Sequence, residues 1–176
     1  MTSYRRYFIP GGTYFFTVTL ADRSSLLLTQ NIAALRAAFR HVRTEIPFVI
    51  DAIVVLPDHL HTIWVLPPDD ADFSTRWKKI KAAFSRQLPK IERRSERRTS
   101  KGERGIWQRR FWEHAVRDEA DWQRHMDYIH FNPVRHGHVR RTADWPYSSF
   151  HRHVKLGMYP REWGNVHEED AGIYGE

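Results

Sequence analysis

Cysteine is absent from this chain of 176 residues, which excludes both a disulfide framework and a metal site built on thiolates. Any metal ion would have to be bound by His, Asp, Glu or Asn. No apolar run approaches the roughly 20 residues that cross a bilayer, and no apolar stretch behind the first residues resembles a signal peptide. We therefore expect a cytoplasmic protein without a membrane anchor. A phosphate-binding P-loop and a glycine-rich dinucleotide fingerprint are also missing, so the sequence does not indicate a nucleotide triphosphate site.

The composition is that of a packed globular chain. Hydrophobic residues make up 41% and aromatic residues 14%, which is enough for one interior, and domains commonly run about 100 to 200 residues. We expect one domain over residues 1–161 that includes a basic loop near residues 90–105 and an aromatic appendix near its C-terminal end. An acidic tail over residues 162–176 follows it.

Positive charge is concentrated in one part of the chain. The formal net charge is +7, yet residues 76–110 alone hold fourteen Lys and Arg against three Glu. Most of the basic residues are Arg, whose planar guanidinium binds phosphate bidentately and stacks on bases. A solvated basic face would explain the charge equally well if it stood alone, but a polyanion is its natural partner. The candidate DNA contacts are Arg5, Arg6, Lys78, Lys79, Lys81, Arg86, Arg93, Arg94, Arg97, Arg98, Arg109 and Arg110.

Hydrophobic periodicity predicts four strands and three main helices. The strands are expected at residues 13–20, 48–56, 59–66 and 106–116. The helices are expected to begin at Asn31, at Ser74 and at Asp118, with Pro133 stopping the last one near Asn132. The order strand, helix, strand, strand, helix, strand, helix predicts an α+β fold, a ferredoxin-like split βαβ antiparallel sheet with one added helix.

Two histidines stand two residues apart at the start of the predicted third strand. His59 and His61 therefore project from the same face of the sheet and can converge on one metal ion. A His-x-His pair by itself is more often a pair of surface or core histidines. The tight turn at Pro57 and Asp58 favours the metal interpretation, because it places the pair at the rim of the sheet.

The added helix carries a polar stripe. Asp121, His125, Tyr128 and Asn132 follow one another at spacings of four, three and four, so they lie along one side of a helix beside an apolar stripe. An arbitrary tyrosine in such a place is usually a packing residue with a satisfied hydroxyl. The stripe is suggestive, but taken alone it leaves a packing role for Tyr128 favoured.

Four segments resemble a known family. They are RRYFIPGGTYFFTVTL, LPDHLHTIWVLP, GIWQRRFWEHAVRDEADWQRHMDYIHFNPVRHG and DWPYSSF, and they are similar to the REP-associated tyrosine transposases, a branch of the single-tyrosine HUH transposases. The resemblance spans about residues 5 to 164, and HLH together with YIHFNPVRHG is far more specific than either motif alone.

The resemblance implies a metal-dependent endonuclease and strand transferase that acts on single-stranded DNA. It implies that His59 and His61 bind Mg²⁺ or Mn²⁺, that Asn132 supplies a third ligand where the wider family often has Gln, and that Tyr128 forms a 5′-phosphotyrosine intermediate. It also implies a substrate of REP-type palindromic hairpins and a bacterial, nucleoid-associated protein. His125 and His130 are candidates for proton transfer or positioning, with a structural role open for each.

Two rival functions remain open at this stage. A non-catalytic ferredoxin-like nucleic-acid-binding protein would explain the aromatic residues and the charge but not the His59, His61 and Tyr128 set. A replication-initiator nickase would use the same HUH chemistry, although the sequence has no helicase domain. A two-histidine phosphodiesterase is disfavoured, because its paired His-x-Thr or His-x-Ser motifs do not occur. We expect a monomer, with a dimer that shares Tyr128 between subunits as the alternative.

Overall fold

The computed structural model describes residues 6–90, 100 and 104–165. Most of the predicted basic loop and most of the predicted acidic tail therefore lie outside the described residues, and so do Arg5, Arg93, Arg94, Arg97 and Arg98.

One antiparallel sheet organises the chain. It consists of β1 (Thr13–Thr19), β2 (Val49–Val55), β3 (His59–Val65) and β4 (Trp112–Ala115). The strands stand in the order β2-β3-β1-β4, and each neighbouring pair is antiparallel. This order follows from two βαβ crossovers that interleave, so the predicted ferredoxin-like split βαβ fold is confirmed.

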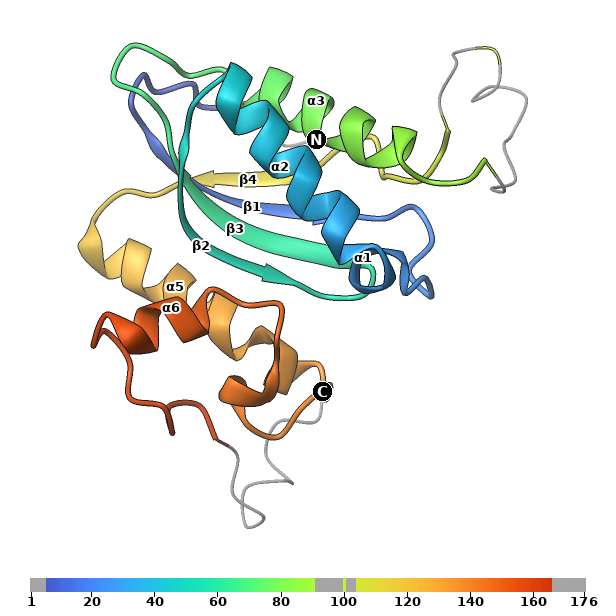
Figure 1. The fold of residues 1–176 in the computed structure, drawn as a ribbon. Coiled ribbons are helices and arrows are strands. Elements are labelled where there is room, and N and C mark those ends of the chain that lie inside the picture. Colours follow the sequence, from blue (N-terminus) through green and yellow to red (C-terminus); the bar gives the residue numbers. More distant parts are fainter. Residues whose placement is uncertain (1–5, 91–99, 101–103, 166–176) are drawn as a thin grey trace, which may run out of the picture.

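The helices cover the two faces of the sheet unequally (Figure 1). They are α1 (Leu27–Gln30), α2 (Ile32–Glu45), α3 (Phe73–Arg86), α5 (Glu119–Arg135), the 3₁₀ turn η1 (Thr142–Asp144) and α6 (Phe150–Lys155). Helices α2 and α3 lie on one face, whereas α5 and the C-terminal segment lie on the other (Figure 1). No helix among the described residues is long and apolar enough to cross a membrane.

Alternation along the strands divides the interior into two hydrophobic clusters. On β1, Phe16 joins the larger cluster with Trp64 and Trp77 beneath α2 and α3, while the adjacent Phe15 joins the cluster with Met126 and Ile129 of α5. Burial of each such side chain stabilises the fold by about 1.5 to 3 kcal/mol. The sheet is therefore a rigid platform with a packed layer on each side.

Three predicted boundaries were wrong. Helix α3 begins at Phe73, because Asp72 rather than Ser74 supplies the cap by accepting a hydrogen bond from the backbone N–H of Thr75. The fourth strand is confined to Trp112–Ala115, with one isolated bridge from Trp107 to Leu20 before it. Helix α5 runs through Pro133 to Arg135, since a proline in the last turn removes only one hydrogen bond while its φ stays helical.

The C-terminal segment covers the outer edge of β2. The Ser149 N–H donates to the Ile53 carbonyl at 2.8 Å, and the Val55 N–H donates to the Tyr147 carbonyl at 2.9 Å. The Trp145 indole N–H donates to the Val55 carbonyl at 3.0 Å. These bonds occupy backbone groups that an edge strand would otherwise leave open.

Candidate active site

His59 and His61 both lie on the face of the sheet that α5 covers. Side chains alternate along β3, so Leu60 and Trp64 enter the opposite cluster while the two imidazoles and Ile63 face α5. Only 5% of His59 and 3% of His61 is exposed, and their ring centroids are 4.9 Å apart. The two rings therefore lie side by side on one face of the sheet, as the alternation along the strand predicts.

Hydrogen bonds fix both rings through the same nitrogen. His59 Nδ1 lies 2.8 Å from the Asp58 carboxylate, and His61 Nδ1 lies 2.8 Å from the Thr17 hydroxyl. Because the carboxylate of Asp58 accepts, His59 Nδ1 carries the proton and Nε2 keeps its lone pair. Burial lowers the pKa of His59 and lowers the pKa of His61 to about 3, so both imidazoles are neutral at physiological pH. A neutral imidazole with a free nitrogen is the form that binds metal.

Tyr128 and Asn132 approach this pair from α5. The ring of Tyr128 stands at 75° to the His61 ring with the centroids 5.1 Å apart, and 37% of the tyrosine is exposed. Asn132, one helical turn further on, is completely buried, yet neither amide atom has a hydrogen-bond partner. His61 Nε2 is likewise buried without a partner. Each such group costs about 1 to 3 kcal/mol unless something satisfies it, so this donor set fits a bound divalent cation.

Two residues near the site were missed by sequence reasoning. His136 follows α5, and its ring centroid lies 5.2 Å from that of His59. The Arg135 guanidinium lies over the Tyr128 ring at 5.8 Å. Arg135 and His136 follow Tyr128 by seven and eight residues, which is about two helical turns. This spacing is the sequence signal that could have identified them. Pro133 concealed it, because we expected the helix to stop there.

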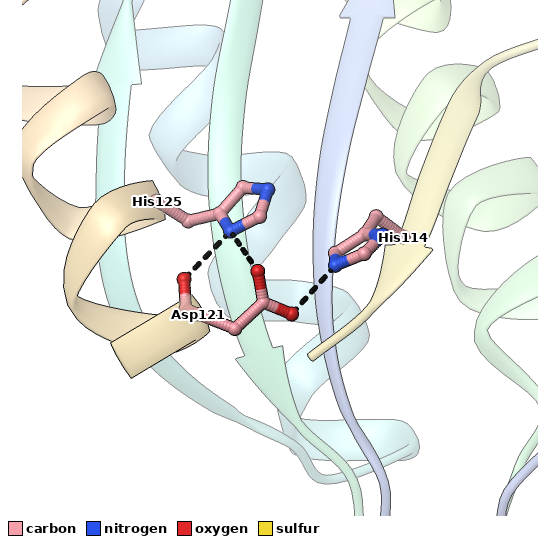
Figure 2. Close-up of side chains that lie close together, drawn as sticks. All are labelled: His114, Asp121 and His125. Carbon is pink, nitrogen blue, oxygen red and sulfur yellow. Dashed lines mark hydrogen bonds and ion pairs between the residues drawn. The ribbon is translucent and has the colours of Figure 1, made fainter. Parts of the chain in front are cut away.

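A second histidine cluster lies between β4 and the first turns of α5 (Figure 2). His114 of β4 lies with Asp121 and His125 of α5, and ligand atoms of the three lie within 4.8 Å of one another, so the group could hold a metal ion. Sequence reasoning missed His114, although alternation along β4 places it on the same face as Trp112. Asp121 already bonds His114 Nε2 at 2.8 Å, and it also accepts from Arg124 at 3.0 Å.

The charge of Asp121 is balanced within the protein. Burial alone would raise its pKa, but the hydrogen bonds from His114 and from the Arg117 backbone N–H outweigh that effect and hold the pKa far below its usual range. A carboxylate with these partners fastens the start of α5 to the edge strand β4. The His59 and His61 site, with its unpartnered atoms, fits a cation better.

The two histidines considered for proton transfer lie on different sides of α5. His125 Nδ1 donates to the Asp121 backbone carbonyl at 2.8 Å, and its ring packs on Phe15 beneath Tyr128. His130 is completely buried, with Nε2 3.1 Å from His153 Nδ1 and 3.3 Å from the Ser149 hydroxyl. The contacts of His130 are therefore those of a residue that anchors the C-terminal segment.

Several predicted DNA contacts gather in one cavity. It has a volume of about 840 Å³ and lies between α3 and the segment of residues 104–111. Of the candidate residues, Arg6, Lys78, Lys81, Arg86 and Arg109 line it. We call it the basic cavity. Burial, together with the charge of the nearby Arg6, lowers the pKa of Lys81 to about 8.

The two other candidate DNA contacts among the described residues lie outside the basic cavity. Lys79 forms an ion pair with Glu45 of α2 at 2.7 Å, away from the basic cavity. Arg110 is exposed and does not line the basic cavity.

The basic cavity and the tyrosine lie on opposite faces of the sheet at the same edge. Arg6 pairs with Glu113 of β4 at 3.1 Å on the α3 side. The neighbouring Trp112 packs against Phe15 at 5.6 Å on the α5 side. Both surfaces therefore border the edge strand β4, through Glu113 on one face and Trp112 on the other.

Comparisons with known proteins agree with this arrangement. A family model described as "Transposase IS200 like" matches residues 11–132. A REP-associated tyrosine transposase of Escherichia coli K12 is 49% identical over 98% of this chain and 97% of its own length. A protein of Haemophilus influenzae, described as a REP-associated tyrosine transposase by inference, is 48% identical over 93% of this chain and 94% of its own length.

A solved structure extends the likeness to three dimensions. It is a REP-associated tyrosine transposase bound to a REP hairpin, and it is 46% identical. It matches 100% of this chain and 98% of that chain with a TM-score of 0.80. The family match covers His59, His61, Tyr128 and Asn132. This chain therefore belongs to the IS200-like transposase family, and within that family to the REP-associated tyrosine transposases.

Proposed function

We propose that this transposase cuts and rejoins single-stranded DNA beside a REP-type hairpin, with Tyr128 as the nucleophile. The observation that carries the proposal is the position of Tyr128. Its ring is accessible to a substrate and stands against His61 at 5.1 Å, one helical turn before the buried, unpartnered amide of Asn132. A tyrosine kept only for packing would not need a polar site of this kind beneath it.

The cleavage step is an in-line displacement at phosphorus. The Tyr128 oxygen forms a bond to the phosphorus, the bond from phosphorus to the 3′ oxygen breaks, and the proton of the phenol leaves as the 3′ oxygen gains one. The product is a 5′-phosphotyrosine and a free 3′ hydroxyl. Because the phosphodiester energy is retained, attack by a 3′ hydroxyl reseals the strand and releases Tyr128 without a nucleotide triphosphate.

His59, His61 and Asn132 would hold the divalent cation, Mg²⁺ or Mn²⁺. All three are neutral donors, so the ion would keep its charge, polarise the scissile phosphate and orient it for attack. The pair of imidazoles favours Mn²⁺ over Mg²⁺, which prefers oxygen ligands. The Asp58 and Thr17 hydrogen bonds hold the two rings in the orientation that this role needs.

His125 is the candidate for positioning the substrate strand beside Tyr128. Its Nδ1 donates to a carbonyl oxygen, which can only accept, so the neutral ring keeps a lone pair on Nε2. It lines the same cavity as Tyr128. His130 faces the C-terminal segment instead, and we assign it a structural role.

The basic cavity is the proposed grip on the hairpin. Its Lys and Arg residues would bind the phosphates of a folded DNA element, while the single-stranded extension passes over the edge of β4 to reach Tyr128 on the other face. Lys79, paired with Glu45, contributes less to this grip. The five candidates outside the described residues remain predicted contacts.

A monomer is the proposed assembly. The segment of residues 145–149 occupies the outer edge of β2, so that edge is not free to pair with the sheet of a second copy. Tyr128 lies beside the histidines of its own chain, which supports cleavage in cis.

Adduct formation tests the proposal directly. The protein is incubated with Mn²⁺ and a 3′-labelled hairpin oligonucleotide with a single-stranded 5′ extension, and the products are separated on a denaturing protein gel. We expect the wild-type chain to retain the label, Tyr128→Phe to lose it, and the control Tyr7→Phe, at the exposed Tyr7, to retain it. Label retained by Tyr128→Phe would overturn the nucleophile. Tight binding without any adduct would favour the non-catalytic DNA-binding alternative.

The initiator-nickase alternative differs in substrate. An initiator of the same chemistry should cut an unstructured strand as well as a hairpin, whereas the proposed function requires the hairpin for efficient cleavage. Equal rates on both would favour the nickase.

A further inference from the structure

A cavity beside Tyr128 is not used by the cleavage chemistry. It has a volume of about 440 Å³, within the range of roughly 300 to 1,000 Å³ for ligand pockets. It is lined by Phe15, Thr17, Trp112, Arg124, His125 and Tyr128. We call it the Trp112 pocket.

Aromatic side chains form the floor and the walls of the Trp112 pocket. Phe15, only 2% exposed, is the floor, and the rings of Trp112 and Tyr128 meet it edge-on at 5.6 and 5.9 Å. Trp112 is 47% exposed, and no other tryptophan appears among the exposed large hydrophobic residues of the described chain. An indole left open at a sheet edge loses hydrophobic stabilisation, which a stacking partner would restore.

The wall formed by His125 is held rigidly. The ring of His125 stacks on that of His114 at 4.8 Å, and His114 stacks on Trp112 at 5.9 Å with an interplanar angle of 5°. The hydrogen bond between Asp121 of α5 and His114 Nε2 holds the start of α5 against β4 (Figure 2). His114 therefore braces both His125 and Trp112, and Trp112 stays 47% exposed.

The polar groups of the Trp112 pocket suit a heterocyclic base. His125 Nε2 is an acceptor, because Nδ1 donates to the Asp121 carbonyl. Arg124 adds positive charge at the rim and holds Asp121 at 3.0 Å. Thr17 connects the pocket to the proposed metal site through its hydrogen bond to His61 at 2.8 Å. A base in this pocket would thus sit next to the phosphodiester that Tyr128 attacks.

We propose that the Trp112 pocket takes one unstacked nucleobase of the single-stranded substrate, stacked on Trp112 and hydrogen-bonded at its edge to His125 Nε2. This inference rests on the proposed cleavage at Tyr128. The base fixes the register of the strand, so that a single phosphodiester is presented to the nucleophile. Trp112 is then the residue that selects the cleavage position, and His125 reads the edge of the base.

An abasic scan tests the inference by binding alone. Each nucleotide of the 5′ extension of the oligonucleotide is replaced in turn by an abasic unit. The affinity of the Tyr128→Phe protein for each oligonucleotide is then measured in chelator by fluorescence anisotropy. Base–aromatic stacking predicts that one position loses about 10- to 100-fold in affinity while its neighbours lose little. Equal losses at every position would overturn the inference, and the scan leaves Trp112 and His125 unchanged.

Pocket variants then locate the selected base. Trp112→Ala should weaken binding of the intact oligonucleotide by about 10- to 100-fold. The oligonucleotide that is abasic at the position found in the scan should bind this variant no more weakly than the intact one does, because the stacking is already lost. Trp112→Phe should restore most of the affinity, and Val49→Ala, an exposed apolar residue on the opposite edge strand, should leave it unchanged. His125→Phe should keep the affinity and lose the preference among bases. The inference would be overturned if the affinity of Trp112→Ala stayed within twofold of that of the chain with Trp112. It would also be overturned if the loss from Trp112→Ala and the loss from the abasic unit added up in full at every position of the extension.

The adduct assay separates this inference from the proposed function. A wild-type chain that forms adduct while Trp112→Ala binds normally refutes the pocket alone. A wild-type chain that never forms adduct refutes the cleavage function, whatever the scan reports.

Discussion

Replacing Asn132 by Leu should make the protein more stable and inactive. The side chain is completely buried and both amide atoms lack partners, so the folded state in chelator carries the desolvation penalty of an amide, about 1 to 3 kcal/mol. Leu has the same number of side-chain heavy atoms and the same branching, and it has a higher helix propensity. We expect the free energy of unfolding to rise by about 1 to 3 kcal/mol.

The assay is thermal unfolding with and without Mn²⁺. For a chain of this size, 1 kcal/mol shifts Tm by about 2 to 4 °C, so in chelator Asn132→Leu should melt roughly 2 to 12 °C above wild type. Excess Mn²⁺ should raise the Tm of the wild-type chain, because it binds the folded state, and raise that of the variant less. DNA cleavage by the variant should fall below detection.

The matched control is the same substitution at a satisfied asparagine. Asn31 donates from Nδ2 to the Leu27 carbonyl at 2.9 Å, so Asn31→Leu should lower Tm and leave cleavage intact. The reasoning is refuted if Asn132→Leu melts below wild type in chelator, since that result would mean that the amide is satisfied and stabilising without an ion.

Three further outcomes follow from the site and the basic cavity. His59→Ala and His61→Ala should each abolish cleavage in Mn²⁺, and the double variant should be no slower than either, because both residues serve one ion; normal rates in either variant would remove the metal site. The pKa of Lys81 is lowered to about 8, so its charge is present below pH 8 and lost above it. The affinity of the wild-type chain for the hairpin, measured by anisotropy, should therefore fall as the pH rises through about 8. Lys81→Arg should keep its affinity over this range, whereas the control Lys78→Arg should lose affinity as the wild-type chain does. A pH-independent wild-type affinity would contradict the role of Lys81. In a competition gel shift at fixed salt, a hairpin with a 5′ extension should bind more tightly than an equal unstructured strand and much more tightly than blunt duplex; equal affinities would leave only nonspecific phosphate binding.

Periodicity predicted the sheet and the placement of the two histidines well. The alternation at His59, Leu60 and His61 fixes which side chains share a face once the strand is recognised. The helical spacing from Asp121 to Asn132 likewise placed Tyr128 and Asn132 on one side of α5. Both are local properties, so tertiary context did not change them.

Contacts between distant segments were beyond the sequence. Nothing local to His114 indicates that it meets Asp121, because the turn between β4 and α5 decides their approach. Pro133 was assigned as a helix end from its local penalty, whereas burial of the last turn outweighs that penalty. The partners of His130 lie 19 and 23 residues away in the C-terminal segment, so its packing role depends on how that segment returns to α5.

The cover over β2 has a consequence for how the chain is made. Residues 145–149 are synthesised after every strand of the sheet, so the β2 edge stays open until this segment has been made. An open edge can pair with another nascent chain. The interval before this segment docks is therefore the time at which the nascent sheet is most open to pairing with another chain. A shortened chain that ends before Trp145 would remain in that state permanently and accumulate as aggregate.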